Sequence, residues 1–340
     1  MAYALERSCE TAAKLRQHIS VVVCTYNRSD LLRLAIHSLQ RQVCDGTFTY
    51  EIIIVDDAST DDSPDVISEL IQHSSVPIYC VRESGKGIAA ARNAGLDAAS
   101  GDWIAFFDDD QLADTRWLAE LWLSREMSGA LCISGSRTLN LPPEKLRNMS
   151  PFVRLTLGEI PIESQPRPSS RKDTICTGNV MMHRSVPDRV GQFDPALVQG
   201  GEDTEFFMRV RKAAIDCFYT PHAVVSHMIP AYRLDEQYLV WASRRGGVCF
   251  AHRDHAERGT AFTLLTAGAR LLQALFVHGV AYVGSVIQRK PAEALGRKCH
   301  MKRAGAYAVH AFRLGVARRR SKSHDRVNFR NERKLFQSPQ

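Results

Sequence analysis

Three adjacent carboxylates, Asp108, Asp109 and Asp110, come directly after a short apolar run in the first third of the chain. That run, Trp103–Phe107, is hydrophobic at every position, which is typical of a strand buried on both faces of a sheet. Adjacent negative charges repel one another unless a cation shares them, and carboxylate oxygens suit Mg²⁺ or Mn²⁺, which also bridge to substrate phosphates. Side chains alternate along extended chain, so we expect Asp108 and Asp110 on one side and Asp109 on the other. The pattern favours a metal and diphosphate site over an acidic turn that caps the helix from Asp114.

A second group of acidic residues opens a predicted helix further along the chain. The segment Gly200–Ala214 begins with two glycines followed by Glu202 and Asp203, and the helix dipole stabilises carboxylates at a helix N-terminus. A group transfer to a hydroxyl needs a base that takes the acceptor proton, and an aspartate within reach does this. We therefore identify Asp203 as the candidate base. The alternative, acids that only cap the helix, accounts for one of the two carboxylates but not for both.

Polar residues also end the first two predicted strands. Thr25, Tyr26 and Arg28 follow the first strand, where they offer a hydroxyl, an aromatic face and a cation beside a helix N-terminus. Stacking on a base and pairing with phosphate are both available there. Asp57 ends the second strand, where its carboxylate can accept hydrogen bonds from a base N–H or a ribose hydroxyl. A local turn or helix cap is the alternative for Asp57.

Two cations and one histidine complete the set of candidate residues. Lys86 lies in the loop Glu83–Gly87, and Arg92 follows it among small residues. Both can neutralise a diphosphate; an ordinary surface cation is the alternative, more so for Lys86 than for Arg92. The loop carries only a short Gly-x-Gly after the third strand, so a dinucleotide-binding fingerprint is not supported. His227, after the apolar run Ala223–Ser226, is either a further metal ligand or a buried core histidine.

Short apolar runs alternate with helical patterns up to about residue 230, as βα units require. Turn residues follow the runs, and acidic residues or a proline stand where a helix is expected to begin. We expect the stretch Leu141–Lys172, which contains six prolines, to be irregular and mobile. The predicted strands are Ile19–Thr25, Tyr50–Val55, Val76–Val81, Trp103–Phe107 and Cys176–His183, and the predicted helices include Leu31–Gln40 and Gly200–Ala214.

Five segments, taken in order, carry a family resemblance. They are VVVCTYNR from Val21, IIIVDDASTD from Ile52, GIAAARNAGLDAASGDWIAFFDDD from Gly87, TGNVMMHR from Thr177 and GGEDTEFFMRV from Gly200. Together they resemble glycosyltransferase family 2, over roughly residues 18–230. The resemblance implies the GT-A fold, which is an α/β architecture with a Rossmann-like, mostly parallel sheet flanked by helices. It also implies transfer of a sugar from a nucleotide sugar with inversion at the anomeric carbon.

The resemblance also implies a role for each candidate residue. Asp57 would contact the nucleotide base, Asp108–Asp110 would form the D-x-D-type site for metal and diphosphate, and Asp203 would be the catalytic base. We therefore expect the nucleotide sugar to contact Thr25, Tyr26, Arg28, Asp57, Arg92, Asp108 and Asp109, and Mn²⁺ or Mg²⁺ to be held by Asp108, Asp110 and His227.

The spacing from Gly200–Phe207 to Trp241–Gly247 (WASRRGG) is similar to that of bacterial exopolysaccharide and succinoglycan-type glycosyltransferases that extend a lipid-linked oligosaccharide at the inner membrane face. Processive synthases of the family carry Q-x-x-R-W and several spanning helices, and we find neither in this sequence. We therefore expect transfer of a single sugar, from a UDP-sugar, to a glycan or lipid-linked acceptor in cell-surface polysaccharide biosynthesis.

Two other functions fit the same fold class. A nucleotidyltransferase that makes sugar nucleotides normally has a glycine-rich basic loop directly after the first strand, and Cys24–Asp30 (CTYNRSD) is not such a loop. A non-catalytic relative that binds sugar nucleotides would be expected to lose an acid at Asp108–Asp110 or at Asp203, and none is lost. Both stay as alternatives to the glycosyltransferase.

Charge and hydropathy change in the last third of the chain. Ala261–Ile287 is markedly apolar but is interrupted by Arg270, Gln273 and His278, which predicts an amphipathic helix that lies on a membrane or packs against the body. Residues 288–340 hold 15 Lys and Arg against 3 Asp and Glu, whereas the preceding residues hold 29 against 34. This basic end predicts an anionic membrane surface as a partner, with a solvated tail as the alternative, and has too few interleaved aromatics for nucleic acid. The predicted parts are a GT-A domain over 18–232, a membrane-associating helical region over 233–320 and a disordered basic tail over 321–340.

The nine cysteines are scattered without a C-x-x-C pair, which argues against a disulfide framework or a zinc site and fits a reducing compartment. The first eighteen residues carry charges throughout and lack the apolar stretch of a secretory signal. We therefore expect a cytoplasmic protein that is peripheral on the inner face of the cytoplasmic membrane.

Overall fold

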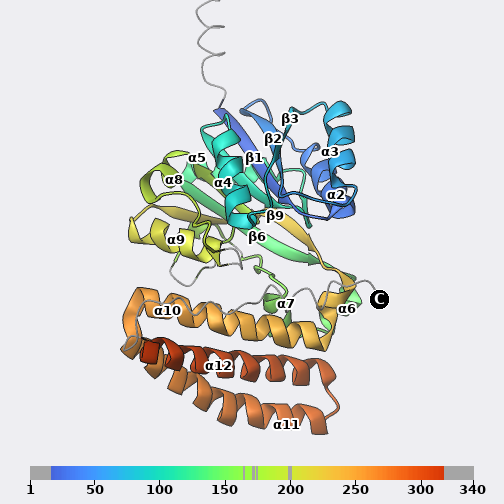
Figure 1. Cartoon of the computed structure of the whole chain (residues 1–340). Coiled ribbons are helices and arrows are strands. Elements are labelled where there is room, and N and C mark those ends of the chain that lie inside the picture. The colour runs from blue at the N-terminus through green and yellow to red at the C-terminus, as the bar shows by residue number, and fades with distance from the viewer. Residues whose placement is uncertain (1–16, 164, 171–172, 174, 198–200, 318–340) are drawn as a thin grey trace, which may run out of the picture. The chain divides into compact units, whose positions relative to one another are not determined.

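The computed structural model describes residues 17–163, 165–170, 173, 175–197 and 201–317 (Figure 1). The chain divides into two compact units. The first comprises Met1–Thr138 and Pro161–His227, and the second comprises Leu139–Ile160 and Met228–Gln340. Residues 139–160 therefore group with the C-terminal helices, whereas the sequence placed them inside the first predicted domain. The basic tail predicted over 321–340 lies outside the described residues.

One mixed sheet forms the centre of the first unit. Its strands are β1 (Gln17–Thr25), β2 (Phe48–Asp56), β3 (Ile78–Arg82), β4 (Trp103–Asp108), β5 (Gln111–Ala113), β6 (Cys132–Asn140), β7 (Arg167–Pro168), β8 (Asn179–His183) and β9 (Cys217–Met228). In the described part of the chain their order is β3-β2-β1-β4-β8-β6-β9-β5, with β7 beside β9. The first four strands run parallel, whereas β8 is antiparallel to β4 and β6 is antiparallel to β8. All five predicted strands form, within three residues at each end.

Helices cover both faces of this sheet (Figure 1). One buried cluster joins Ile19, Val21 and Val23 of β1 to three helices on one face, α2, α3 and α5. A second cluster joins Val22 to α4, α8 and α9 on the other face. Successive side chains of a strand point to opposite faces, so a strand that is hydrophobic throughout is buried on both. The helices are α2 (Ser29–Leu39), α3 (Ser63–Gln72), α4 (Ile88–Ala98), α5 (Trp117–Ser128), α8 (Ser185–Val190) and α9 (Glu202–Lys212).

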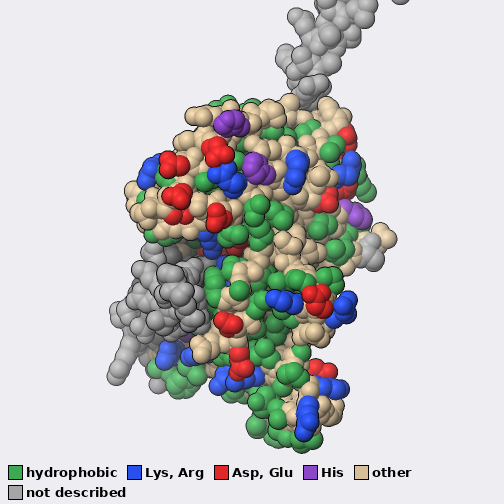
Figure 2. Space-filling view, turned by 90° about the vertical axis from the view of Figure 1, so that its right-hand side faces the viewer, with side chains coloured by type: hydrophobic (Ala, Val, Ile, Leu, Met, Phe, Trp, Pro, Cys, Tyr) green, Lys and Arg blue, Asp and Glu red, His purple; other side chains and the backbone are tan. Residues whose placement is uncertain are grey.

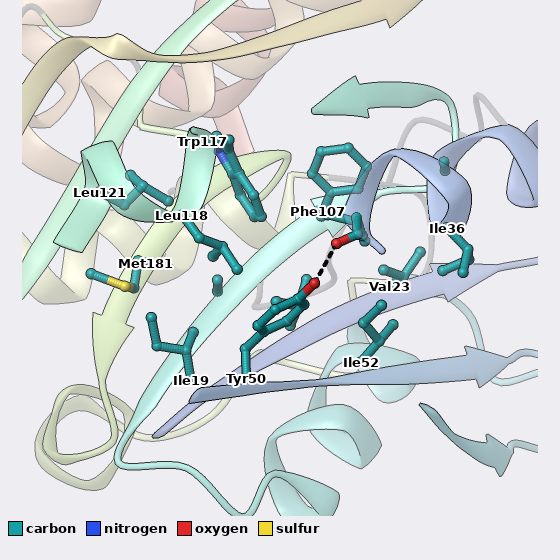
Figure 3. Close-up of a cluster of buried hydrophobic side chains, with 14 of the residues drawn as sticks. Ile19, Val23, Ile36, Tyr50, Ile52, Phe107, Trp117, Leu118, Leu121 and Met181 are labelled. Carbon is teal, nitrogen blue, oxygen red and sulfur yellow. Dashed lines mark hydrogen bonds between the residues drawn. The ribbon is translucent and has the colours of Figure 1, made fainter. Parts of the chain in front are cut away.

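Aromatic side chains fill the first of these clusters (Figure 3). The rings of Phe107 and Trp117 pack with their centroids 5.1 Å apart. The Tyr50 hydroxyl donates a hydrogen bond to the Leu39 carbonyl oxygen at 2.8 Å, which satisfies a buried polar group. Burial raises the pKa of Tyr50 to about 12, so the hydroxyl stays a donor. The cluster thus fixes β2, β4, α2 and α5 next to the edge where the strands end.

The parallel strands end close together at one edge of the sheet. Thr25 of β1 is in register with Asp56 of β2, and β4 ends beside them at Asp108. The β8 strand runs the other way, so its first residue, Asn179, pairs with Phe107 at the same edge. Loops from separate parts of the sequence therefore meet at the edge where open α/β sheets bind their ligands.

Helices make up most of the described second unit. They are α6 (Pro143–Arg147), α7 (Pro151–Thr156), the 3₁₀ turn η1 (Ala231–Leu234), α10 (Glu236–Gln273), the π-helical segment η2 (Ala274–Gly279), α11 (Val280–Ile287) and α12 (Pro291–Ala317). The α10, η2 and α11 segments follow one another, and α12 returns along them (Figure 1). Gly259 interrupts α10 with φ 80° and ψ 177°, which only glycine adopts without strain.

The stretch Leu141–Lys172, predicted to be irregular, contains two short helices, α6 and α7. A proline stands in the first turn of each, and Ser150 caps α7 by accepting a hydrogen bond from the Val153 N–H at 3.3 Å. Phe152 and Val153 are buried in the core of the second unit. The prediction was wrong for residues 143–147 and 151–156 because proline is tolerated in the first turn of a helix, where its missing N–H has no partner to lose.

Candidate active site

Asp109 is a deeply buried carboxylate at the edge of the sheet. The Thr25 hydroxyl donates to one of its oxygens at 2.9 Å, and Arg28 Nη1 donates to the other at 2.6 Å. Burial raises the pKa of Asp109 to about 6; Arg28 acts against this shift and Asp110 adds to it. Two residues predicted to bind the nucleotide sugar, Thr25 and Arg28, are thus brought together around a third. Their hydrogen bonds tie the end of β1 to the end of β4.

Asp110 lies between a cation and an imidazole. Its Oδ2 atom is 3.2 Å from Arg28 Nη1 and 3.5 Å from His227 Nε2. His227 comes from β9, which pairs with the short strand β5 directly after the carboxylates. We predicted Asp109 on the side opposite Asp108 and Asp110, but Arg28 contacts both Asp109 and Asp110. The alternation ends because β4 itself ends at Asp108.

Asp108 is the most accessible of the three carboxylates, with 35% of its side chain exposed. Its Oδ1 atom lies 3.8 Å from Arg92 Nη2, and the Gln111 amide donates to Oδ2 at 3.4 Å. Desolvation raises the pKa of Asp108, Arg92 opposes the shift, and the neighbouring Asp110 adds to it. A carboxylate that is partly exposed and repelled by its neighbour is a ready ligand for a cation.

Arg92 forms a buried ion pair with Glu202. Arg92 comes from α4 and Glu202 is the first residue of α9, so the pair joins these two helices. Arg92 exposes only 7% of its surface and Glu202 only 5%. Burial and the neighbouring Asp203 raise the pKa of Glu202, and Arg92 lowers it. The sequence predicted Arg92 at the nucleotide. The structure places it between Asp108 and the start of α9.

Asp203 is the second residue of α9 and follows the N-cap Gly201 by two positions; the φ of Gly201, 93°, is left-handed. Its Oδ1 atom accepts hydrogen bonds from the Thr204 N–H at 2.6 Å and the Thr204 hydroxyl at 3.3 Å. Burial lowers the pKa of Arg92 and Arg137, but the surrounding acids, Asp203 among them, raise it above the usual value. Asp108 acts on the same two arginines. The predicted base and the predicted metal ligand therefore lie around shared cations.

Sequence analysis missed Arg137. It lies on β6, and Cys176, Asp108, Asp110 and Asp203 all raise its pKa against the lowering effect of burial. Its segment, CISGSRTLN, mixes small and polar residues and carries no motif that points to a site. A guanidinium among carboxylates at a ligand-binding edge is suited to pair with a phosphate.

Hydrogen bonds tie together the loops that follow β1 and β2. The Asn27 side chain accepts a hydrogen bond from the Thr60 N–H at 2.7 Å, and Asn27 has a left-handed φ of 52°. Asp57 Oδ2 accepts a hydrogen bond from the Gly87 N–H at 3.0 Å. Tyr26, beside Asn27, is 49% exposed. The structure thus brings the predicted base-contacting residues to neighbouring strand ends, with an aromatic ring open to solvent.

The donor set of the edge fits a small divalent cation. Asp108 and Asp110 supply carboxylate oxygens, and His227 supplies a ring nitrogen close to Asp110. Within the described residues, no group of three or more His, Cys, Asp or Glu side chains is arranged to hold a metal ion by itself. Mg²⁺ and Mn²⁺ sites commonly use one or two carboxylates, with water and substrate phosphates in the remaining coordination positions.

Gly178 leaves the space that Asp108 occupies. A Cβ atom at Gly178 would lie 2.3 Å from Asp108 Oδ2 and 2.6 Å from Gln111 Nε2. We expect Gly178→Ala to displace the carboxylate and lower sugar transfer about 10²-fold, the loss typical of an ångström-scale misplacement. Initial rates of transfer measure this. Gly305→Ala, at a helical glycine with open space around it, is the control, and native-like transfer by Gly178→Ala would contradict the prediction.

Solved structures with this architecture define the class of the fold. One is the mannosyltransferase PcManGT from Pyrobaculum calidifontis in complex with GDP-Man and Mn²⁺, with a TM-score of 0.52 and 16% identity over 91% of this chain and 77% of that chain. Another is S. aureus TarS 1–349, with a TM-score of 0.52 and 16% identity over 88% of this chain and 92% of that chain. The chain has the GT-A fold, with a mixed sheet flanked by helices.

The family follows from the sequence of the first unit. The model of the family described as "Glycosyl transferase family 2" matches residues 20–190, and the chain belongs to this family. Its predicted family, fold and enzyme class are thereby confirmed, and the chain is a glycosyltransferase.

Curated relatives include proteins of polysaccharide synthesis. The succinoglycan biosynthesis protein ExoM of Rhizobium meliloti (strain 1021) is 28% identical over 266 residues, which are 74% of this chain and 81% of ExoM. The UDP-Glc:alpha-D-GlcNAc-diphosphoundecaprenol beta-1,3-glucosyltransferase WfaP of Escherichia coli is 37% identical over 93 residues, which are 27% of this chain and 35% of WfaP. The shorter match lies within the length of a single GT-A domain, so it compares only part of each protein.

Proposed function

We propose that this glycosyltransferase transfers a single sugar, with inversion, from a nucleotide sugar to a hydroxyl group, in a reaction that needs Mn²⁺ or Mg²⁺. The observation that carries the proposal is the position of Asp203 in the first turn of α9, directly after Glu202, whose ion-pair partner Arg92 also lies 3.8 Å from Asp108 Oδ1. A base and a diphosphate-binding carboxylate on neighbouring elements are what a direct displacement at the anomeric carbon requires.

Each residue of the edge has a separate role in this displacement. Asp203 accepts the proton of the acceptor hydroxyl while the oxygen of that hydroxyl forms a bond to the anomeric carbon. The bond from that carbon to the diphosphate breaks on the opposite side, and the nucleoside diphosphate leaves with the electron pair. A metal ion, when bound at Asp108, Asp110 and His227, supplies positive charge to the diphosphate. Arg137 adds a fixed cation at the same edge.

The Arg92–Glu202 pair positions the base. Glu202 precedes Asp203 in α9, and its buried partner Arg92 also lies 3.8 Å from Asp108 Oδ1. A rigid link of this kind keeps base and carboxylate at a fixed separation, which is the geometric requirement of proximity catalysis. The diphosphate lies against Thr25, Arg28 and Asp109. The nucleotide base contacts Tyr26 and Asp57.

The relatives support a particular donor and acceptor class. The name of WfaP specifies UDP-Glc as donor and a diphosphoundecaprenol-linked sugar as acceptor, and ExoM is named for succinoglycan biosynthesis. TarS 1–349 has also been solved with UDP. We assign a UDP-sugar as the donor of this chain and a glycan or lipid-linked oligosaccharide of cell-surface polysaccharide synthesis as its acceptor. With such an acceptor, we assign the enzyme to the cytoplasmic face of the cytoplasmic membrane.

The test is a panel of UDP-, GDP- and dTDP-sugars, each with Mn²⁺, Mg²⁺ or chelator, with and without membrane lipid extract as acceptor. We expect one UDP-sugar to be consumed only with metal, and its sugar to appear in the lipid fraction. Consumption of a nucleoside triphosphate and a sugar phosphate instead would identify a nucleotidyltransferase. Donor binding without turnover under every condition would identify a non-catalytic relative.

A further inference from the structure

The helices of the second unit carry large apolar side chains on their outer side. Leu265, Leu272, Phe276 and Ile287 are each at least 60% exposed. A surface helix normally turns its apolar side toward the protein and its polar side toward water, and this segment does the reverse. The exposed side chains, here called the apolar stripe, are Leu264, Leu265, Leu271, Leu272, Leu275, Phe276, Val277, Val280, Val283, Val286 and Ile287.

The inner side of the same helices is polar. Arg270 Nη2 lies 3.7 Å from Asp254 Oδ2, to which the Tyr307 hydroxyl also donates at 2.7 Å. Arg297 of α12 lies 3.2 Å from the His278 ring nitrogen. Arg270 and His278 therefore meet polar partners inside the helical unit while large apolar side chains of the same helices face outward, which is an arrangement expected next to lipid. Buried polar residues on this inner side include Thr263, His278 and Ser285.

The end of α12 extends the apolar stripe. A Cβ atom at Gly315 would lie 3.6 Å from Leu264 Cδ1, so the last turns of α12 lie against the start of the stripe. Val309, Phe312 and Val316 on these turns are exposed. Since the stripe covers about 24 residues at about 1.5 Å each, it is roughly 36 Å long. This far exceeds the scattered single hydrophobics of an ordinary surface.

Charge distinguishes between the occupants of this surface. The sequence contains no Asp or Glu between Glu257 and Glu293, whereas Arg258, Arg289 and Lys290 flank the stripe. A second copy of the chain would bring the same positive charge to the contact, but an anionic lipid surface would complement it. Figure 2 shows hydrophobic side chains gathered at the bottom of the view, with both basic and acidic side chains beside them.

We propose that the apolar stripe, with Val309, Phe312 and Val316, inserts into an anionic phospholipid bilayer with its helices in the plane of the surface. One helical segment, Glu236–Ile287, is long and apolar enough to cross a membrane by length and composition. Only one of its sides is apolar over Leu264–Ile287, however, and the returning α12 exposes Lys302 and Arg313. An in-plane orientation keeps these charges at the lipid headgroups, whereas a membrane-spanning hairpin would bury them in hydrocarbon.

Flotation of the full chain with vesicles tests this surface. Vesicles are made of phosphatidylcholine with or without phosphatidylglycerol, and the variant is Leu272→Asp with Phe276→Asp. The matched control, Leu123→Asp with Met127→Asp, changes two exposed hydrophobics with the same spacing on α5. We expect native chain and control to float with the anionic vesicles, and the variant to lose at least about tenfold in partitioning, because two large apolar side chains no longer enter lipid.

Further measurements distinguish the possible outcomes. Hydrolysis of donor in water shows that the variant is folded. Vesicle binding needs neither donor nor acceptor, so a failure of the chain to bind vesicles would not contradict the proposed reaction. Equal flotation of native chain and variant would overturn the proposal. Resistance of the bound chain to alkaline carbonate would indicate a spanning helix and overturn the in-plane orientation. A native dimer that the variant dissociates, without any change in vesicle binding, would show that a second copy covers the stripe.

Discussion

Asp203→Asn is expected to lower sugar transfer by about 10²–10⁴-fold, which is the range that a positioned general base contributes. The amide keeps the shape of the carboxylate, and its oxygen can still accept the hydrogen bonds that Thr204 donates. What it loses is the capacity to take a proton from the acceptor hydroxyl. Binding of the nucleotide sugar is expected to persist, because the nucleotide side of the edge is formed by the loops after β1 and β2.

The measurement is single-turnover transfer together with donor affinity from titration calorimetry. Glu205→Gln is the matched control, since it removes a carboxylate from the same first turn of α9, where Glu205 pairs with Arg209 at 2.8 Å. The control is expected to transfer sugar at a rate close to native. Transfer by Asp203→Asn at the rate of the Glu205→Gln control would remove Asp203 as the base, and a loss of donor affinity would assign it to binding.

Local sequence was sufficient to predict which residues lie at the edge of the sheet where the parallel strands end. Trp103–Phe107 is hydrophobic on both sides, so its burial as a central strand and the position of Asp108 at its end follow from pattern alone. The same holds for Thr25 and Asp57, which follow equally apolar runs. Parallel strands place their ends at one edge, and this brought the predicted residues together without any knowledge of their contacts.

The partners of these residues could not be predicted, because they depend on chain far away in sequence. The Arg92–Glu202 pair joins residues 110 positions apart, and neither segment contains a pattern that predicts the other as its partner. Arg137 is a single cation on a strand of small and polar residues. Asp109 and Asp110 lie just beyond β4, where the rule of alternation no longer holds, so their shared contact with Arg28 needed the structure.

The second unit shows a different limit. The sequence predicted an amphipathic helix over Ala261–Ile287, in which Arg270, Gln273 and His278 interrupt the apolar residues. In the structure Thr263 is buried, and Arg270 lies over the Tyr307 ring with its guanidinium carbon 4.2 Å from the centroid, whereas Gln273 is exposed. Periodicity identifies two sides of a helix but does not say which side faces inward. Here Thr263 and Arg270 face inward, where Asp254 of α10 and Tyr307 of α12 are the charged and aromatic partners of Arg270.

Asp110→Asn is expected to lower metal-dependent transfer by about 10²–10³-fold, the loss typical of removing one electrostatic stabiliser of a reacting group. An amide oxygen binds a divalent cation far more weakly than a carboxylate does, and it no longer balances the charge of Arg28 at 3.2 Å. Native chain treated with chelator is expected to lose transfer to the same extent and to regain it with Mn²⁺. Titration of transfer rate against Mn²⁺ concentration is the measurement.

Substitutions at two neighbouring carboxylates, Asp114 and Asp109, test whether the metal effect is specific to Asp110. Asp114→Asn removes an exposed carboxylate beyond the edge, one that caps a turn through the Arg116 N–H at 2.9 Å, and should leave the Mn²⁺ titration unchanged. Asp109→Asn replaces one of the two oxygens that accept hydrogen bonds from Thr25 and Arg28 with an amide donor and removes the negative charge beside Arg28. We expect it to lower the melting temperature while its remaining activity keeps the native Mn²⁺ dependence. A shifted titration for Asp109→Asn together with an unshifted one for Asp110→Asn would exchange the two roles. The metal would then be held on the side of the cluster that faces β1, and His227 would be left as a buried histidine of β9.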